Sequence, residues 1–347
     1  MFEKYVEKYI REGQAPCLRN QIIDFQKKHP FGGKRILDAT PIYFNTMLKY
    51  EAIIAGGGHL EVFCNNKNFD YRVIGILQQL GIPVHTNTDN LGSFDLIFDC
   101  GAELKKIDSI SGRVELTASG IAQYKNCNKF VASVDNSRLK EYETRYGTAD
   151  GLIRALKKLN LLQKDSGEKR NALVFGFGKV GKGICRELKR QNYKIFVVEK
   201  PGIAVGDYPC FYTNQKEIIF NAIQHSELVI SAVGSYNAVG SMFDSCRTVF
   251  PEHVRFINMG YEQDFVGWEN AENSGYPLNF ILEEPTQTKY IDPVMALSNA
   301  CGVRFLEGGP YCFKPSGFTD KIVLPLEDDE NRIEGDMRNA HNDLPAL

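Results

Sequence analysis

A glycine-rich turn at residues 176–181 carries the clearest chemical signal in the sequence. The turn, Gly176-Phe-Gly-Lys-Val-Gly181, follows the apolar run Ala172-Leu-Val-Phe175, and a helical pattern begins directly after it. Glu199 lies 23 residues after Gly176, at the end of the next apolar run. Glycines at this spacing between a strand and a helix, with an acid about 20 residues further on, form the fingerprint of a dinucleotide-binding site.

Each position of the turn has a chemical role in such a site. Gly176 permits the tight turn, Gly178 lets the backbone approach a pyrophosphate, and Gly181 lets the helix pack closely on the strand. The first helical residues, Lys179 and Val180, present backbone N–H groups to the phosphates. The alternative is a glycine turn that is kept only for packing.

The acid at the end of the second run predicts the type of dinucleotide. Glu199 can accept hydrogen bonds from the adenosine ribose and would repel a 2′-phosphate, which favours NAD over NADP. The adjacent Lys200 weakens that preference. If the turn serves packing alone, Glu199 is a surface charge at the end of a strand.

The turn also carries a family resemblance. Gly176-Phe-Gly-Lys-Val-Gly-Lys-Gly183 resembles the Gly-Tyr-Gly-Asp-Val-Gly-Lys-Gly turn of the S-adenosylhomocysteine hydrolase family. Other segments are similar to the family's motifs in the same order, over most of residues 35–300: 98–104 to Asp-Asp-Gly-Gly-Asp-Leu, 114–120 to Glu-Glu-Thr-Thr-Thr-Gly, 134–147 to Val-Asn-Asp-Ser…Lys…Phe-Asp-Asn-Leu-Tyr-Gly, and 292–299 to His-Pro…Ser-Asn.

The resemblance implies a fold and a chemistry. It implies a substrate domain, an inserted NAD domain, and a return of the chain to the substrate domain near residue 293. In the family, NAD oxidises the 3′-hydroxyl of the substrate ribose, elimination and water addition follow, and the ketone is then reduced. Partner subunits there exchange C-terminal tails carrying Lys-Pro over the cofactor. Phe313-Lys-Pro315 is similar to that tail, so the resemblance implies a homodimer with Lys314 at the cofactor; the alternative is a surface charge.

Most family positions that hold the substrate or move its protons are changed in this chain. The replacements are Pro41, Asn45, Cys100, Leu116, Tyr261 and Asp292. Removing a hydroxyl proton during hydride transfer needs a base within reach. A lost hydrogen-bonding partner also removes discrimination that apolar contacts cannot replace. We therefore do not expect adenosylhomocysteine hydrolysis by the family's full mechanism.

The positions that survive, or whose replacements remain polar, are the candidate site residues implied by the resemblance. Lys140 aligns with the family's catalytic Lys and could act as the base beside Glu143, which replaces an Asp. Two replacements, Tyr261 and Asp292, can still bond a substrate hydroxyl; the alternative is that they only fill space. The residues implied for the cofactor are Thr117, Ser119, Thr144 and Asn258. An exposed Lys paired with a neighbouring Glu, and strand-end hydroxyls that cap a turn, are the structural alternatives.

The elements that must position these residues alternate between strands and helices. This alternation predicts an α/β fold of parallel strands with helices on both faces, and 347 residues are enough for two domains. We expect a substrate-like domain over 1–148, a Rossmann NAD domain over 149–290, a return and cofactor-capping segment over 291–325, and an acidic flexible tail over 326–347. The polar run 163–170 is expected to connect the domains.

The charge and the cysteine content limit which partners and which cellular compartment we expect. The chain has 41 Lys and Arg against 43 Asp and Glu, so it has no net basic field for nucleic acid or for an anionic membrane. Nine scattered cysteines without a CxxC pair indicate reduced thiols in the cytoplasm. No set of His, Cys and carboxylates has ligand spacing, so we expect no metal. The expected partners are an unknown small-molecule substrate and a second copy of the chain.

Three functions remain open at this point. The first is an NAD-dependent enzyme of oxidoreductase or lyase type that acts on a hydroxyl-bearing metabolite other than S-adenosylhomocysteine. The second is a non-catalytic relative that keeps NAD as a structural or sensing ligand. The third is residual adenosylhomocysteine hydrolysis, which an assay for homocysteine release would settle.

Overall fold

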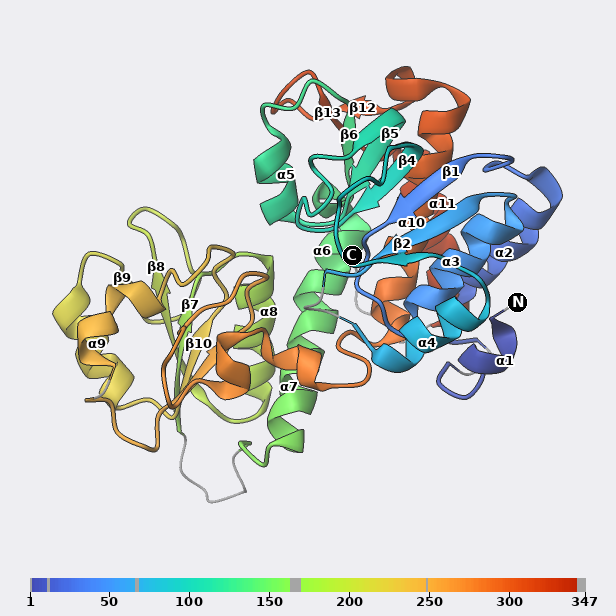
Figure 1. Cartoon of the computed structure of the whole chain (residues 1–347). Helices are drawn as coiled ribbons and strands as arrows, with labels where there is room; N and C mark the ends of the chain where they lie inside the picture. Colours follow the sequence, from blue (N-terminus) through green and yellow to red (C-terminus); the bar gives the residue numbers. More distant parts are fainter. Residues whose placement is uncertain (1, 11–12, 66–68, 163–169, 248, 342–347) are drawn as a thin grey trace. The chain divides into compact units, whose positions relative to one another are not determined.

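The computed structural model describes residues 2–10, 13–65, 69–162, 170–247 and 249–341. The chain divides into two compact units (Figure 1). Unit 1 contains Met1–Tyr142 and Gln287–Leu347, and unit 2 contains Glu143–Thr286. Unit 2 is therefore an insertion in unit 1, with its ends at slightly earlier residues than the predicted 149 and 290. Most of the predicted connection, residues 163–169, lies outside the described residues.

Unit 2 contains a five-stranded parallel sheet in the order β11-β10-β7-β8-β9. The chain begins at β7, extends the sheet to one side through β8 and β9, and then returns to the other side with β10 and β11. This order is that of a Rossmann-type, doubly wound sheet. The strands are β7 (Asn171–Phe175), β8 (Lys194–Glu199), β9 (Cys210–Tyr212), β10 (Leu228–Ser231) and β11 (Arg255–Asn258).

Both faces of this sheet are buried. Ala172 and Val174 of β7 pack in one apolar cluster, and Leu173 and Phe175 pack in another on the opposite face. Successive strand side chains point to opposite faces, so a continuous apolar run suits a sheet that is covered on both sides. Helices α7 and α8 contribute to the first cluster and α9 to the second; their bounds are Thr148–Lys158, Lys179–Arg190 and Lys216–Gln224.

Shorter helical segments complete unit 2. A π-helical turn precedes α7, and single 3-10 turns lie in the connections on either side of β11. Their bounds are η2 (Glu143–Gly147), η3 (Gly240–Met242), η4 (Asp244–Cys246), η5 (Glu272–Gly275) and η6 (Leu278–Ile281).

Unit 1 contains an eight-stranded sheet in the order β12-β13-β6-β5-β4-β1-β2-β3. All its pairs are parallel except the antiparallel pair β12 and β13. The predicted parallel α/β fold is confirmed in both units. The strands are β1 (Arg35–Asp38), β2 (His59–Phe63), β3 (Val84–His85), β4 (Ser93–Asp99), β5 (Asp108–Glu115), β6 (Val131–Ser133), β12 (Lys314–Pro315) and β13 (Ile322–Leu324).

The helices of unit 1 come from both of its chain segments. From the first segment they are α1 (Glu3–Val6), α2 (Pro16–Lys28), α3 (Thr46–Ala55), α4 (Tyr71–Gln79), α5 (Ala118–Tyr124), η1 (Val134–Asn136) and α6 (Arg138–Tyr142). From the second they are α10 (Thr288–Glu307), η7 (Gly309–Cys312) and α11 (Glu327–Ala340). Helices α2, α10 and α11 pack on one another, so the two segments share one core.

Helix α11 corrects the prediction of a flexible tail for residues 326–347. Ile333 and Met337 are buried, and Arg304 of α10 binds the carboxylate of Asp329 at 3.0 and 3.2 Å. Four of the seven acids in residues 327–347 lie in the first turn of the helix, where the helix dipole favours negative charge. Residues 342–347 lie outside the described residues.

If α11 is part of the folded unit, shortening its buried side chain must cost stability. We expect Ile333→Ala to lower the free energy of unfolding by about 2–4 kcal/mol, because it leaves a cavity under α11. Denaturant unfolding of full-length protein measures this, with the exposed Asn339→Ala as the control. Equal stability of the two variants would contradict the packing of α11.

Candidate functional site

The glycine turn of unit 2 has the geometry that a phosphate-binding turn needs. Gly176 has a φ of +89°, a conformation that disfavours any side chain. A Cβ at Gly181 would lie 2.0 Å from the carbonyl oxygen of Gly176, so α8 can start this close to β7 only with glycine. A Cβ at Gly178 would meet nothing within 4 Å, so the backbone there faces open space.

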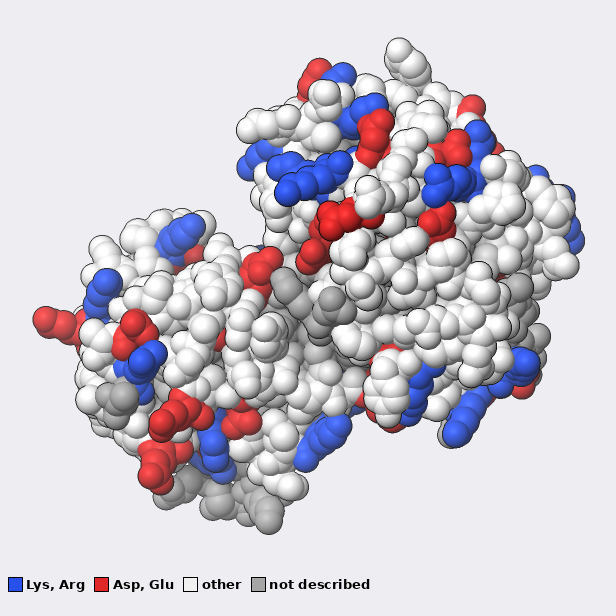
Figure 2. All heavy atoms as spheres, in the orientation of Figure 1, with Lys and Arg blue, Asp and Glu red and all other residues white. Residues whose placement is uncertain are grey.

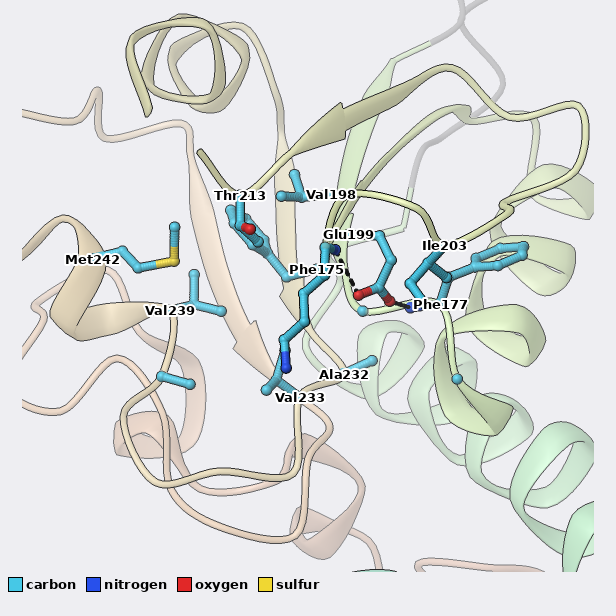
Figure 3. A pocket seen from close by; sticks show the side chains of 14 residues that line it. Phe175, Phe177, Val198, Glu199, Ile203, Thr213, Ala232, Val233, Val239 and Met242 are labelled. Carbon is cyan, nitrogen blue, oxygen red and sulfur yellow. Dashed lines mark hydrogen bonds between the residues drawn. The ribbon is translucent and has the colours of Figure 1, made fainter. Parts of the chain in front are cut away.

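This open space belongs to a pocket of about 570 Å³ that lies wholly within unit 2 (Figure 3). Residues at the ends of β7, β8 and β10 line it, including Phe175, Gly178, Glu199 and Val233. The order of strands reverses between β7 and β10, and ligands bind doubly wound sheets at this switch point, outside the carboxyl ends of the strands. The pocket is therefore where the fingerprint predicts it.

Glu199 ties the end of β8 to the glycine turn. Its Oε2 accepts a hydrogen bond from the backbone N–H of Phe177 at 2.8 Å, and its Oε1 accepts one from the N–H of Lys200 at 2.8 Å (dashed lines in Figure 3). Each carboxylate oxygen can accept a second bond, so Glu199 can still receive a ribose hydroxyl. The carboxylate thus braces the turn as well as lining the pocket.

Asp264 supports the opposite wall and was not found from the sequence. It is fully buried, and its oxygens accept hydrogen bonds from the hydroxyl of Ser231 (2.8 Å) and from the backbone N–H groups of Val239 (3.2 Å) and Gly240 (2.8 Å). Val239 lines the pocket. No local motif marks Asp264, because these three partners lie 24 to 33 residues away along the chain.

The other candidates of unit 2 lie outside the pocket lining. Asn258 is fully buried, and its amide donates to the carbonyls of Glu262 (2.7 Å) and Gly275 (2.9 Å) while its Oδ1 accepts from Gly260 N–H. It organises the loop after β11, in which Tyr261 is half-buried. The candidates Glu143 and Thr144 lie in η2, and Glu143 is buried.

In unit 1, Thr117 serves as a helix cap. Its Oγ1 accepts the N–H of Gly120 at 3.1 Å at the start of α5, and the N–H of Gly101 at 3.1 Å. It donates to Glu115 at 2.7 Å, and the hydroxyl of Ser119 donates to it at 3.4 Å. Thr117 therefore caps a turn, and its hydroxyl is bonded within unit 1.

Two further unit 1 candidates differ in accessibility. Lys140 is buried in α6, and its backbone N–H donates to the Ser137 hydroxyl at 3.0 Å. Lys314 is exposed in β12, which pairs with β13 at the edge of the unit 1 sheet. The segment that resembles the family's exchanged tail thus forms an edge hairpin of its own unit.

Asp292 caps another helix. Its two oxygens accept the N–H groups of Cys17 and Leu18 at 2.9 Å each, in the first turn of α2. These amides have no partner within their own helix, so a buried carboxylate satisfies them. Burial raises the pKa of Asp292 from 3.8 to about 6, although the amide hydrogen bonds oppose this shift.

Two more buried carboxylates meet at the carboxyl ends of β4 and β5. Asp99 accepts N–H groups of Cys100 and Leu104 and the Tyr124 hydroxyl, and Glu115 accepts the N–H groups of Gly101, Ala102 and Thr117. Burial raises the pKa of Glu115 to about 7, and repulsion from the Asp99 carboxylate is the second cause of this rise. Arg113 lies close enough to stabilise the charge of Asp99.

A buried ion pair lies at the end of β1. The ammonium of Lys49 binds Asp38 and, at 2.8 Å, the hydroxyl of Thr40, with both charged side chains almost fully buried. Burial lowers the pKa of Lys49, and Asp38 opposes the shift. Spacing alone could not have revealed this pair, because it joins a strand end to the first turn of the following helix.

The surface and composition of the described residues add four observations. The face seen in Figure 2 carries interspersed basic and acidic side chains. Within the described ranges, no helix is long and apolar enough to cross a membrane, and no group of three or more His, Cys, Asp or Glu is arranged to hold a metal ion. All nine cysteines are free thiols.

The cap provided by Asp292 has a measurable pH dependence. The native state binds the proton of this group more tightly than the unfolded state, so its contribution to stability falls as pH rises from about 4 to about 6 and is constant above that range. A rise of the pKa from 3.8 to about 6 corresponds to a loss of about 3 kcal/mol of stability across this range.

Unfolding titrations of wild type and Asp292→Asn between pH 4 and 7 isolate the contribution of Asp292, because the contributions of other groups cancel in the difference. We expect the stability of Asp292→Asn to increase relative to wild type by about 3 kcal/mol across the interval. A difference that does not vary with pH would show that Asp292 is not a buried, titrating cap.

Comparisons with known proteins find sequence relatives at low identity. The chain is 25% identical over 294 residues to the adenosylhomocysteinase of Thermoplasma acidophilum, covering 75% of this chain and 69% of that protein. Identity is also 25% over 218 residues to the adenosylhomocysteinase of Pyrococcus abyssi, covering 53% and 50%. The matched part of the chain thus spans half to about two thirds of these relatives. No protein-family model matches the chain.

Comparisons with solved structures give matches of lower sequence identity. A dipicolinate synthase chain from Bacillus halodurans matches with a TM-score of 0.45 and 13% identity, over 80% of this chain and 99% of that chain. A D-isomer specific 2-hydroxyacid dehydrogenase family protein from Aeromonas salmonicida matches with a TM-score of 0.40 and 12% identity, over 80% and 97%. The sequence matches show that the chain is similar, at low identity, to the adenosylhomocysteinases.

Proposed function

We propose that this protein binds NAD in unit 2 and acts as an NAD-dependent oxidoreductase or lyase on a hydroxyl-bearing metabolite other than S-adenosylhomocysteine. One observation carries the proposal: the fingerprint glycines and Glu199 meet at a pocket at the switch point of a doubly wound sheet. The relationship to adenosylhomocysteinases supports hydride chemistry on a hydroxyl group.

The residues of the pocket fit a dinucleotide. Gly178 leaves open the space that a Cβ would fill, so the backbone can lie against a pyrophosphate. The first turn of α8, with Lys179 and Val180, offers N–H groups and the positive end of the helix dipole. Glu199 would receive the adenosine ribose, while apolar side chains such as Ile203 and Met242 would enclose the adenine. A bound nicotinamide supplies the hydride acceptor.

The residues that would transfer protons are those implied by the resemblance to the S-adenosylhomocysteine hydrolase family. We assign Lys140 as the base that takes the substrate hydroxyl proton, with Glu143 and Tyr261 as supporting polar groups. The remaining implied cofactor contacts are Thr117, Ser119, Thr144, Asn258 and Lys314. Asp292 is engaged by backbone amides on both oxygens, which supports a structural role for it rather than a substrate contact.

The substrate is expected to differ from the family's. The side chains of Pro41 and Leu116 cannot make the hydrogen bonds and proton transfers of the histidine and carboxylate that they replace, and the Cys100 thiol bonds only weakly. Since a site selects its substrate through such bonds, their loss argues for a different hydroxyl compound. Mass spectrometry of small molecules that copurify with native protein tests cofactor and substrate together. We also propose a homodimer in the cytoplasm, which native mass spectrometry and localisation would test.

A non-catalytic, NAD-sensing relative is the second candidate. It is supported by buried polar groups of unit 1 that bond to the protein itself rather than facing a ligand. These groups are Asp292, Glu115 and the ion pair of Lys49 with Asp38. Protein that retains NAD but reduces none of it with a panel of hydroxyl metabolites would favour this function.

The open space beside the backbone of Gly178 allows a direct test of cofactor binding. We expect Gly178→Ala to fold normally, because a Cβ has room there, and to lose NADH affinity at least about tenfold, because the methyl group keeps the pyrophosphate from the backbone amides. NADH fluorescence titration and thermal unfolding measure the two effects.

A matched variant separates binding from folding. Gly181→Ala forces a contact with the Gly176 carbonyl and is expected to lower stability by about 1–3 kcal/mol. Unchanged NADH affinity in folded Gly178→Ala would contradict the proposed pyrophosphate position.

Catalysis by Lys140 is tested separately. We expect Lys140→Ala to reduce turnover of the copurifying or panel substrate at least about 100-fold, because general-base catalysis contributes about that much. NAD binding to the unit 2 pocket should persist. Lys125→Ala, at an exposed lysine of unit 1, is the control. Full activity of folded Lys140→Ala would refute the assigned role.

A further inference from the structure

The polar lining of the unit 2 pocket contains both a carboxylate and an ammonium group. Among the described residues that line it, the charged side chains are Glu199 and Lys200, and Thr213 adds a hydroxyl. The other lining residues are glycines or have apolar side chains. The balance between these two neighbouring charges therefore decides how much negative charge the adenosine end of a ligand can carry.

Glu199 is partly committed to the protein. Each of its oxygens already accepts a backbone N–H at 2.8 Å, from Phe177 and from Lys200. Hydrogen bonds from backbone donors stabilise the negative charge of a carboxylate. They also fix the carboxylate against the glycine turn, so Glu199 keeps a structural function whether or not the adenosine ribose bears a phosphate.

Lys200 is placed to receive additional negative charge. It directly follows Glu199 at the end of β8, it is exposed, and it lines the pocket. Rossmann sites that accept a 2′-phosphate use a basic side chain near the ribose, whereas sites restricted to NAD rely on the acid alone. An ammonium on a flexible stem can bind phosphate as a point charge. This pocket contains both determinants.

We propose that Lys200 allows the pocket to bind 2′-phosphorylated and unphosphorylated nicotinamide dinucleotides with comparable affinity. The inference rests on the proposed cofactor site and concerns only its selectivity. Glu199 braces the turn and bonds the ribose of NAD, and Lys200 neutralises the 2′-phosphate of NADP. Selectivity is thereby weak, although a fingerprint that ends in Glu predicts strong discrimination against NADP.

Fluorescence titrations of full-length protein with NADH and NADPH test the proposal. We expect wild-type dissociation constants within about tenfold of each other. Lys200→Met should raise the NADPH constant at least about tenfold more than the NADH constant, because a charge-assisted phosphate contact is lost. Lys200→Arg should restore NADPH binding. Lys194→Met, at an exposed lysine at the opposite end of β8, is the charge-matched control and should not change the ratio.

The outcomes separate this inference from the proposed function. NADH binding with NADPH at least about 100-fold weaker would overturn the inference and leave the NAD site intact. The role of Lys200 would be overturned if Lys200→Met left the ratio of the NADPH and NADH dissociation constants unchanged. It would also be overturned if Lys194→Met changed that ratio by the same factor. Failure of both dinucleotides to bind would overturn the cofactor site itself, and the inference with it.

Discussion

Helix α8 lies so close to the turn after β7 and to η2 that two of its positions have no room for a methyl group. A Cβ at Gly181 would lie 2.0 Å from the carbonyl oxygen of Gly176, and one at Gly183 would lie 2.0 Å from that of Arg145 in η2. The positive φ of Gly176 makes this approach possible. The position of the first α8 amides, the openness at Gly178 and the bond from Phe177 to Glu199 all depend on this packing.

The sequence was most informative where backbone geometry restricts the residue type. Three glycines and one acid predicted the turn, the strand before it, the helix after it and the pocket, because few other residues satisfy a positive φ or such close packing. The parallel sheets followed from alternating runs whose side chains are buried on both faces.

Other features depended on partners that are distant in sequence. Asp264 braces a pocket wall through residues at least 24 positions away, and Asp292 caps a helix 275 residues earlier. Composition misled at α11, because four of the seven acids that suggested a solvated tail occupy the helix N-terminus, while only a few apolar residues such as Ile333 and Met337 anchor the helix. A count of charged residues does not show which face of a helix is apolar.

The two units differ in how their strand ends are used. In unit 2 the carboxyl ends of the strands border a pocket, whereas in unit 1 polar groups at the ends of β1, β4 and β5 bind one another or nearby backbone. Such networks fix loops firmly but leave fewer groups for a ligand. The open pocket of unit 2 and the internally bonded strand ends of unit 1 thus differ in how many polar groups remain available to a ligand.

The insertion of unit 2 also sets an order of events during synthesis. Every strand of unit 2 lies within residues 143–286, so its sheet can form once that stretch has left the ribosome. Unit 1 can be completed only after its second segment has been synthesised, since β6 pairs with β13 at Ile322–Leu324 and α2 is capped by Asp292. Until then β6 is an open sheet edge, the kind of surface that invites pairing with other chains. The inserted unit therefore prolongs the aggregation-prone stage of the nascent protein.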